Sequence, residues 1–356
     1  MDAAPAMNHG LAVSEPEHAQ ALGEAPVGRE VGANAAIAPV EPVEPVDDEG
    51  RAREAWLAQR ERGSRTGIRA LLLFTRVFGR RGGRALLRVI VFYFVLFAGG
   101  PRRASRAWYE RVLGRSSFWT AYHHLLRFAE VAFDRLFLVR GELERFEFDR
   151  VGTELMRETI AEGRGALLLG AHFGSFEAMR AAGRDSALPI NILAHNENAR
   201  MIAAFLDEVS AGQSRVKVIE IDPDDRTYIL TVKQRIEAGE LVAILGDRLG
   251  LNDRATTVEF FGAPARLPAG PYIMASVLRC PVFMVFGTFV APRRYVLRCE
   301  LLAERVVLPR SSRDPSITAY AQQFAARLEH YARRAPDNWF NFYDFWKMHP
   351  DEQQRD

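Results

Sequence analysis

Short apolar runs alternate with helix-like segments after Gly141, and this alternation limits the fold more than any other feature of the sequence. Near-continuous apolar runs are typical of strands buried on both faces, and the intervening helices provide the cover. The runs are ALLLGA, LPINILA, VKVIEI, LVAILG, PVFMVFGTFV and RRYVLRCELL. We therefore expect an α/β fold with a mostly parallel central sheet flanked by helices.

The beginning of the sequence has a different composition. Residues 1–62 are rich in Ala, Pro and Glu and include the string EPVEPVDDEG. Such a segment buries too little apolar surface to offset the entropy lost on ordering, so we expect a disordered tail with a polar helical lead-in at its end. The expected organisation is tail and lead-in over 1–62, a membrane-associated helical region over 63–150 and an α/β core over 151–356.

The membrane prediction rests on an apolar segment bordered by arginines. Residues 89–100 form an uncharged run of twelve residues, with Phe92, Tyr93, Phe94 and Phe97 inside it. A helix of that length spans about 18 Å, which is shorter than the roughly 30 Å hydrocarbon core. Aromatic bulk between cations is typical of a helix that lies in the interface of an anionic membrane. The alternative is a buried core helix with a solvated basic collar.

Charge, cysteine and histidine content exclude several other classes. The net charge of +2 gives no reason to expect a nucleic-acid partner. Cys280 and Cys299 provide neither a disulfide framework nor zinc spacing, and we expect no metal site. His123 and His124 are adjacent in an expected helix over 117–141, so they point about 100° apart and are expected to pack rather than to react. A second long helix is expected over 317–334, followed by an aromatic tail that packs against the sheet edge, with contact to lipid as the alternative.

The string GALLLGAHFGSFEAMR, residues 165–180, places His172 and Glu177 where a buried strand ends and a helix begins. Chemistry in open parallel sheets collects at this end of the strands. Ser175 is the expected N-cap, which leaves His172 in the loop and Glu177 in the first helical turn. We expect Glu177 to accept the proton of His172 Nδ1, so that Nε2 can take a proton from a hydroxyl. Gly174 is expected to let a substrate approach the backbone.

Ser175 allows a second interpretation, in which it is a nucleophile and the protein is an esterase or a ping-pong transferase. The local string FGSFE lacks the G-x-S-x-G elbow that exposes such a serine. Capping is therefore the expected role of Ser175.

Four blocks in order carry a resemblance to a known family. They are HFGSFE (172–177), VAILGDR (242–248), VEFFGAPARLPAGPYIMA (258–275) and WFNFYDFW (339–346). Together they resemble the lauroyl and myristoyl transferase type of bacterial lipid A biosynthesis late acyltransferases, over roughly residues 69–346. This family belongs to the lysophospholipid and glycerolipid acyltransferases, whose motif is H-x4-D/E.

The resemblance implies His172 as general base, Glu177 as its partner and Asp247 as a further required acid. Asp247 could orient the acceptor or simply cap a loop. Arg248 is a departure from the family pattern and a candidate for stabilising the oxyanion. The family's arginine between the first two blocks has no clear counterpart, with Arg200 and Arg215 as the nearest.

Further candidates lie in the third block and at the end of a strand. Phe260, Phe261 and Gly262 are expected in a rigid loop beside the acyl channel, with plain packing as the alternative for the two phenylalanines. His195 could line the same crevice, although a structural role is the stronger expectation for it.

The resemblance implies a membrane-associated acyltransferase without a cofactor. The donor is a fatty acyl thioester of acyl carrier protein or of CoA, and the acceptor is a hydroxyl of a lipid or glycolipid. The expected partners are acyl carrier protein and anionic membrane lipid, and the expected location is the cytoplasmic face of the bacterial inner membrane. The alternatives are a hydrolase with the same site and a non-catalytic lipid-binding protein with the same fold.

Overall fold

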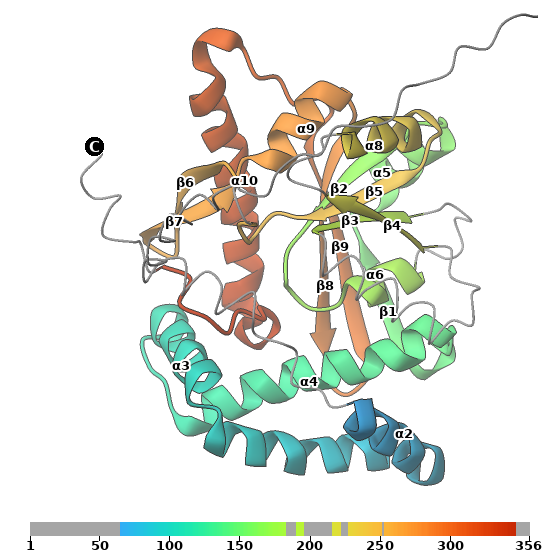
Figure 1. Ribbon diagram of the computed structural model, residues 1–356, viewed down its shortest axis with the longest axis vertical. Helices are drawn as coiled ribbons and strands as arrows, with labels where there is room; N and C mark the ends of the chain where they lie inside the picture. Colours follow the sequence, from blue (N-terminus) through green and yellow to red (C-terminus); the bar gives the residue numbers. More distant parts are fainter. Residues whose placement is uncertain (1–64, 183–189, 196–215, 222–226, 251–252, 347–356) are drawn as a thin grey trace, which may run out of the picture. The chain divides into compact units, whose positions relative to one another are not determined.

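The apolar runs of the sequence form the strands of a central sheet in a computed structural model of the chain (Figure 1). The structure describes residues 65–182, 190–195, 216–221, 227–250 and 253–346, all within one compact unit that spans 52–356. The expected tail and lead-in, the expected helix after β3, and Arg200 and Arg215 lie outside the described residues.

The sheet has seven strands in the order β1-β9-β8-β2-β5-β3-β4. Every neighbouring pair is parallel except β8 with β9, which confirms the predicted mostly parallel sheet. The strands are β1 (Glu147–Val151), β2 (Ala166–Gly170), β3 (Ile190–His195), β4 (Val216–Ile221), β5 (Leu241–Leu245), β8 (Val282–Val290) and β9 (Arg294–Ala303). The expected domain boundary at residue 150 falls inside β1.

Both faces of the sheet are covered by helices, and β2 shows why its sequence is apolar throughout. Leu167 and Leu169 belong to the core shared with α8, α9 and α10. Ala166 and Leu168 point to the opposite face, where they pack with side chains of α5 and α6. Alternating side chains of one strand thus enter two different cores. These helices are α5 (Glu154–Ala161), α6 (Phe176–Ala182), α8 (Tyr228–Glu237), α9 (Gly270–Leu278) and α10 (Arg313–Arg334).

A two-stranded antiparallel hairpin replaces the loop expected after the second block. Its strands are β6 (Ala255–Phe260) and β7 (Ala263–Pro268). The hairpin packs on α10, where the Gln322 side chain donates to Glu259 O at 2.9 Å and accepts from Glu259 N at 2.8 Å. Phe261 and Gly262 form the turn with positive φ angles of 52° and 70°. Gly262 suits this turn because glycine enters the left-handed region without strain.

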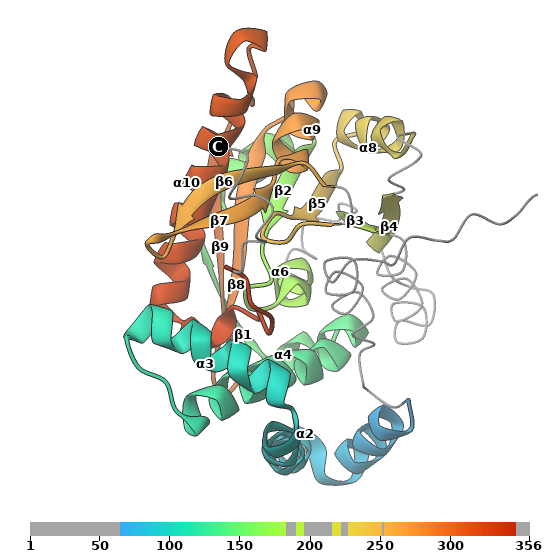
Figure 2. The ribbon, with the colours of Figure 1, turned by 60° about the vertical axis from the view of Figure 1, so that its left-hand side comes forward.

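Three long helices precede the sheet. The first and the third pack beside the end at which β8 terminates, and the second packs against the third (Figures 1 and 2). They are α2 (Arg65–Phe97), α3 (Gly99–Leu113) and α4 (Phe118–Arg140). A reciprocal capping box of Ser117 and Thr120 starts α4, and Gly141 in the left-handed conformation ends it, as the sequence predicts. Short 3₁₀ turns occur at Leu143–Arg145, Arg310–Ser312 and Pro336–Asn338.

The helix α2 has two unlike faces, one packed on α4 and one with exposed apolar side chains. On the inner face Arg80 pairs with Asp134 of α4, and Arg84 pairs with Glu130. The outer face leaves large apolar side chains exposed, namely Val89, Ile90, Phe92, Tyr93, Phe94, Leu96 and Phe97. We call these seven residues the α2 apolar face.

No single described helix is long and apolar enough to cross a membrane. The pair Val77–Phe97 and Gly99–Leu113 passes the same test of length and composition when taken together, and it is bent by 95°. Among the described residues, the apolar surface of this bent pair is therefore the candidate membrane contact.

Candidate functional site

The parallel pairing of β2 with β5 places His172 beside Asp247. Gly170 is the register partner of Leu245, and each of the two functional residues lies two positions further along its own strand direction. This register brings the two side chains together at the carboxyl end of the sheet, the end at which chemistry collects in open parallel sheets. His172 Nδ1 lies 2.8 Å from Asp247 Oδ1.

Among the described residues, three donors hold Asp247. Besides the imidazole, the backbone N–H of His172 donates to Oδ2 at 2.9 Å, and Trp339 Nε1 donates to the same oxygen at 3.0 Å. The carboxylate is 1% exposed, whereas the His172 side chain remains 31% exposed. An ionised carboxylate can only accept, so Nδ1 carries the imidazole proton and Nε2 has a free lone pair.

The predicted contact between Glu177 and His172 Nδ1 is wrong. Glu177 lies in the first turn of α6, as expected, but Arg135 of α4 donates from Nε to its Oε1 at 2.5 Å. Because α4 packs against α6, a guanidinium group is available to the carboxylate there, and Asp247 occupies the place beside Nδ1 instead. The acid that touches the imidazole therefore comes from the second block rather than from the H-x4-E motif.

The surroundings set the charge states of this pair. Burial would raise the pKa of Asp247, but the charge and hydrogen bonds of His172 and the charge of Arg248 outweigh it and lower that pKa to about 2. Burial and the positive charge of Arg248 lower the pKa of His172 below its ordinary value, against the opposing pull of Asp247. Near neutral pH the pair is therefore a neutral imidazole beside a carboxylate.

Ser175 has the capping role predicted for it. Its Oγ accepts from Ala178 N at 3.1 Å, and its own backbone N–H donates to Gly287 O at 2.8 Å. Ser175 is 1% exposed. A buried hydroxyl that already accepts from the helix is poorly placed to act as a nucleophile, and its N–H is not available to an oxyanion.

Gly174 is required by packing within the protein. It has a φ of 68°, and a Cβ atom there would lie 1.8 Å from Gly287 O. The missing side chain lets the turn after β2 approach β8. This contact accounts for the glycine without a substrate.

Arg248 lies beside the pair and is tied to the C-terminal segment. Its terminal nitrogen donates to Phe340 O at 2.5 Å, and the guanidinium lies 5.6 Å from the ring centre of Tyr343. Its Nε is buried without a hydrogen-bond partner among the described residues. Arg248 thus brings a positive charge to the site with one donor unused.

Phe260 and Phe261 are packed in an aromatic cluster. Both are buried, with Trp108 of α3 at 4.9 Å from Phe261 and Trp339 at 5.4 Å from Phe260 between ring centres. This arrangement agrees with the packing alternative. Substrate contact by these two rings and by Gly262 stays a prediction, as does any role of His195 at the end of β3.

The C-terminal aromatic segment is the part of the site that the sequence did not indicate. It was expected at the sheet edge, but it runs across the turn after β2. Phe340 N donates to His172 O at 2.8 Å, and Gly174 N donates to Asn338 O at 2.8 Å. Residues more than 160 positions after His172 therefore fix the loop that carries it. The one available signal was the tryptophan that opens the fourth block.

A mostly parallel α/β sheet with an imidazole–carboxylate pair at its carboxyl end is an arrangement that can take a proton from a nucleophile. The sequence model of the bacterial lipid A biosynthesis acyltransferase family matches residues 124–348, so the chain belongs to that family and is an acyltransferase. The match starts inside α4, later than the resemblance over 69–346. Among curated proteins, no match is found.

Proposed function

We propose that this acyltransferase moves a fatty acyl group from a thioester of acyl carrier protein or CoA to a hydroxyl of a lipid A precursor, with His172 as general base and Asp247 as its partner. The observation that carries the proposal is the His172 Nδ1–Asp247 contact of 2.8 Å, combined with an imidazole that is still partly exposed. The family supplies the reaction class.

In the proposed step, Nε2 of His172 takes the proton of the acceptor hydroxyl while the oxygen attacks the thioester carbonyl. An ester C–O bond forms and the C–S bond breaks. The departing thiolate receives the proton from Nε2, which restores the neutral imidazole. Asp247 stabilises the imidazolium between these two proton transfers and keeps the ring in the required tautomer.

The carbonyl oxygen becomes negative during attack, and we assign its stabilisation to Arg248. The guanidinium is close enough to His172 to lower its pKa, and its buried Nε has no partner among the described residues. A fixed cation in a site shielded from water stabilises developing negative charge without reorganising.

The pH dependence of transfer is the first expected result. A protonated His172 cannot act as a base, so kcat/KM should fall as the pH decreases through the pKa of His172. Since burial and Arg248 lower that pKa, the acid limb should lie below the ordinary value of 6.5. The measurement is the rate of product formation between pH 4 and 9 by mass spectrometry, with a lauroyl thioester of acyl carrier protein and a lipid A precursor bearing free hydroxyls. An acid limb well above 6.5 would exclude this base.

Membrane contact is assigned to the α2 apolar face together with Trp119 of α4. Phe92 holds the two helices together there, with ring centres 5.9 Å from Phe118 and 6.4 Å from Trp119. An exposed contiguous apolar surface of this kind marks an interaction site with a protein or a membrane. Because the proposed acceptor is a lipid, we assign this surface to a membrane rather than to a protein partner.

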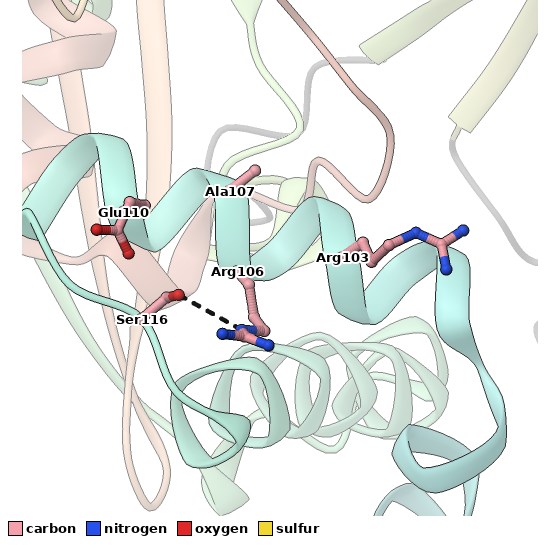
Figure 3. A pocket seen from close by; sticks show the side chains of 5 residues that line it. All are labelled: Arg103, Arg106, Ala107, Glu110 and Ser116. Atoms are coloured by element: carbon pink, nitrogen blue, oxygen red, sulfur yellow. Dashed lines mark hydrogen bonds between the residues drawn. The ribbon is translucent and has the colours of Figure 1, made fainter.

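Next to this surface, α3 carries a hollow of about 250 Å³ lined by Arg103, Arg106, Ala107, Glu110 and Ser116 (Figure 3). Arg106 Nε donates to Ser116 Oγ at 3.4 Å. We assign Arg103 and Arg106 to the phosphate groups of anionic lipid, which they would meet once the apolar face is inserted. Because the expected donors are made in the cytoplasm, we place this contact on the cytoplasmic face of the inner membrane.

The second expected result concerns vesicle binding. The double substitution Tyr93→Ser and Phe97→Ser removes two side chains that are 65% and 72% exposed. We expect the partition coefficient onto vesicles of phosphatidylethanolamine and phosphatidylglycerol to fall about 10- to 100-fold, since apolar area on the inserted face is lost. Vesicle co-sedimentation measures it.

The matched control is Leu230→Ser with Val277→Ser, on α8 and α9, which removes side chains that are 62% and 61% exposed. This pair is expected to leave vesicle binding unchanged. Equal loss of binding in both double variants would show that general surface hydrophobicity, rather than the α2 apolar face, drives membrane association.

A further inference from the structure

We infer that Trp339 is a positioning residue for the catalytic pair, which its indole N–H orients through Asp247. The inference rests on the proposed function of His172 and Asp247 and adds a residue that touches neither donor nor acceptor. Its observation is the hydrogen bond from Trp339 Nε1 to Asp247 Oδ2 at 3.0 Å.

The carboxylate needs this third donor because of how its two oxygens are used. Oδ1 receives the imidazole Nδ1–H, and Oδ2 receives the backbone N–H of His172. Both of these donors belong to the residue that Asp247 has to orient. The indole is the donor from a different part of the chain, so it fixes the carboxylate plane independently of the imidazole.

Trp339 is itself held tightly. It is 1% exposed, and its ring centre lies 4.6 Å from Trp108 of α3 and 4.9 Å from Phe345. Its carbonyl oxygen accepts from His124 Nε2 of α4 at 2.8 Å. The other ring nitrogen of His124 lies 2.8 Å from Ser105 Oγ of α3, and both residues are fully buried.

These contacts form one hydrogen-bonded chain, Ser105–His124–Trp339–Asp247–His172. Burial lowers the pKa of His124 to about 4, so this ring is neutral at physiological pH and donates from Nε2 while it accepts at Nδ1 from the serine. The tryptophan that orients the acid is thus anchored to α3 and α4, two of the three helices assigned to the membrane side.

Removing the indole N–H has a defined electronic consequence. The carboxylate charge is then shared with one donor fewer, and Asp247 attracts the imidazole proton more strongly. The pKa of His172 should therefore rise, because the opposing effect of the Arg248 charge stays the same. A role in packing alone would not move this pKa.

The test replaces Trp339 with β-(3-benzothienyl)alanine, which keeps the shape of tryptophan and has sulfur in place of the N–H, and in parallel with phenylalanine (Trp339→Phe). Trp346→Phe is the matched control. Trp346 lies in the same aromatic cluster and also donates its indole N–H, to Phe260 O at 3.2 Å, but it does not touch Asp247.

Two quantities are measured on the full chain. The first is the pKa and tautomer of His172 by NMR with ¹⁵N-labelled histidine, where His172→Gln assigns the resonance. The second is kcat with the lauroyl thioester of acyl carrier protein and the lipid A precursor. The benzothienyl variant is expected to raise the His172 pKa by at least half a unit and to lower kcat roughly tenfold. Trp346→Phe is expected to change neither.

A benzothienyl variant with the His172 pKa and kcat of the unaltered protein would overturn the inference, as would equal changes in Trp346→Phe. If Trp339→Phe folds, it is expected to change the His172 pKa and kcat in the same direction. If it does not fold, the benzothienyl variant alone tests the inference. Failure of the proposed function gives a different result. His172→Gln would then retain acyl transfer, whether or not the benzothienyl variant shifts the His172 pKa.

Discussion

Replacing His172 with alanine is expected to lower kcat for acyl transfer by at least 10²–10⁴-fold, the usual contribution of a general base. The reason is geometric: His172 presents Nε2 from a partly exposed ring whose Nδ1 is committed to Asp247 at 2.8 Å. The turn that carries His172 is fixed against β8 by the backbone N–H of Ser175, which donates to Gly287 O at 2.8 Å. Transfer of a lauroyl group to the lipid A precursor, followed by mass spectrometry, is the measurement.

The controls for this variant separate chemistry from folding. His172→Ala removes one donor from the buried Asp247 carboxylate, so the thermal unfolding midpoint should fall, and activity is compared at a temperature at which both proteins are folded. His330→Ala, at a half-buried histidine on α10, should retain full activity. Ser175→Ala tests the hydrolase alternative: thioester hydrolysis without acceptor that is abolished by this change would replace the general-base mechanism. Retained transfer in His172→Ala would remove the imidazole from the reaction.

Much of the fold could be predicted because the sequence pattern is local. The central strands β2, β5 and β8 are near-continuous apolar runs, and α4 is bracketed by a serine cap and a glycine stop that the chain shows directly. β1 and the β6–β7 hairpin escaped prediction for a physical reason. β1 is an edge strand that is mostly exposed, and the strands of the hairpin pair only with each other, so their sequences carry weaker periodicity.

The site was predictable only in part. Its contacts depend on the register of β2 with β5 and on the C-terminal segment, which packs against the loop that carries His172. His172 and Ser175 could be placed from the strand-to-helix transition alone. The partner of His172 could not, because it depends on β5 lying next to β2, and this neighbour relation is not encoded near residue 172. The tail that carries Trp339 is more distant still and reaches the site through contacts with α3 and α4.

The acid that serves His172 can be identified by comparing two conservative substitutions. Asp247→Asn keeps the size of the side chain and removes its charge, and we expect a loss in kcat of roughly 10³–10⁴-fold, as when the carboxylate that orients a catalytic histidine becomes an amide. The cause is the tautomer, because an amide nitrogen at this place donates where Nδ1 needs an acceptor. The His172 pKa, followed by ¹⁵N NMR, should fall, since the charge that opposes burial and Arg248 has gone.

Glu177→Gln is the matched comparison, and it is expected to leave the His172 pKa unchanged. Glu177 pairs with Arg135, whose side chain is 39% exposed, so water can replace much of what that cation loses. We expect a smaller fall in kcat than in Asp247→Asn and no displacement of the His172 pKa. The reverse pattern, in which Glu177→Gln moves this pKa and Asp247→Asn does not, would return the partner role to the acid of the H-x4-E motif. Asp247 follows the end of β5 and Glu177 lies in the first turn of α6, so the His172 pKa reports which of these two carboxylates lies against the imidazole.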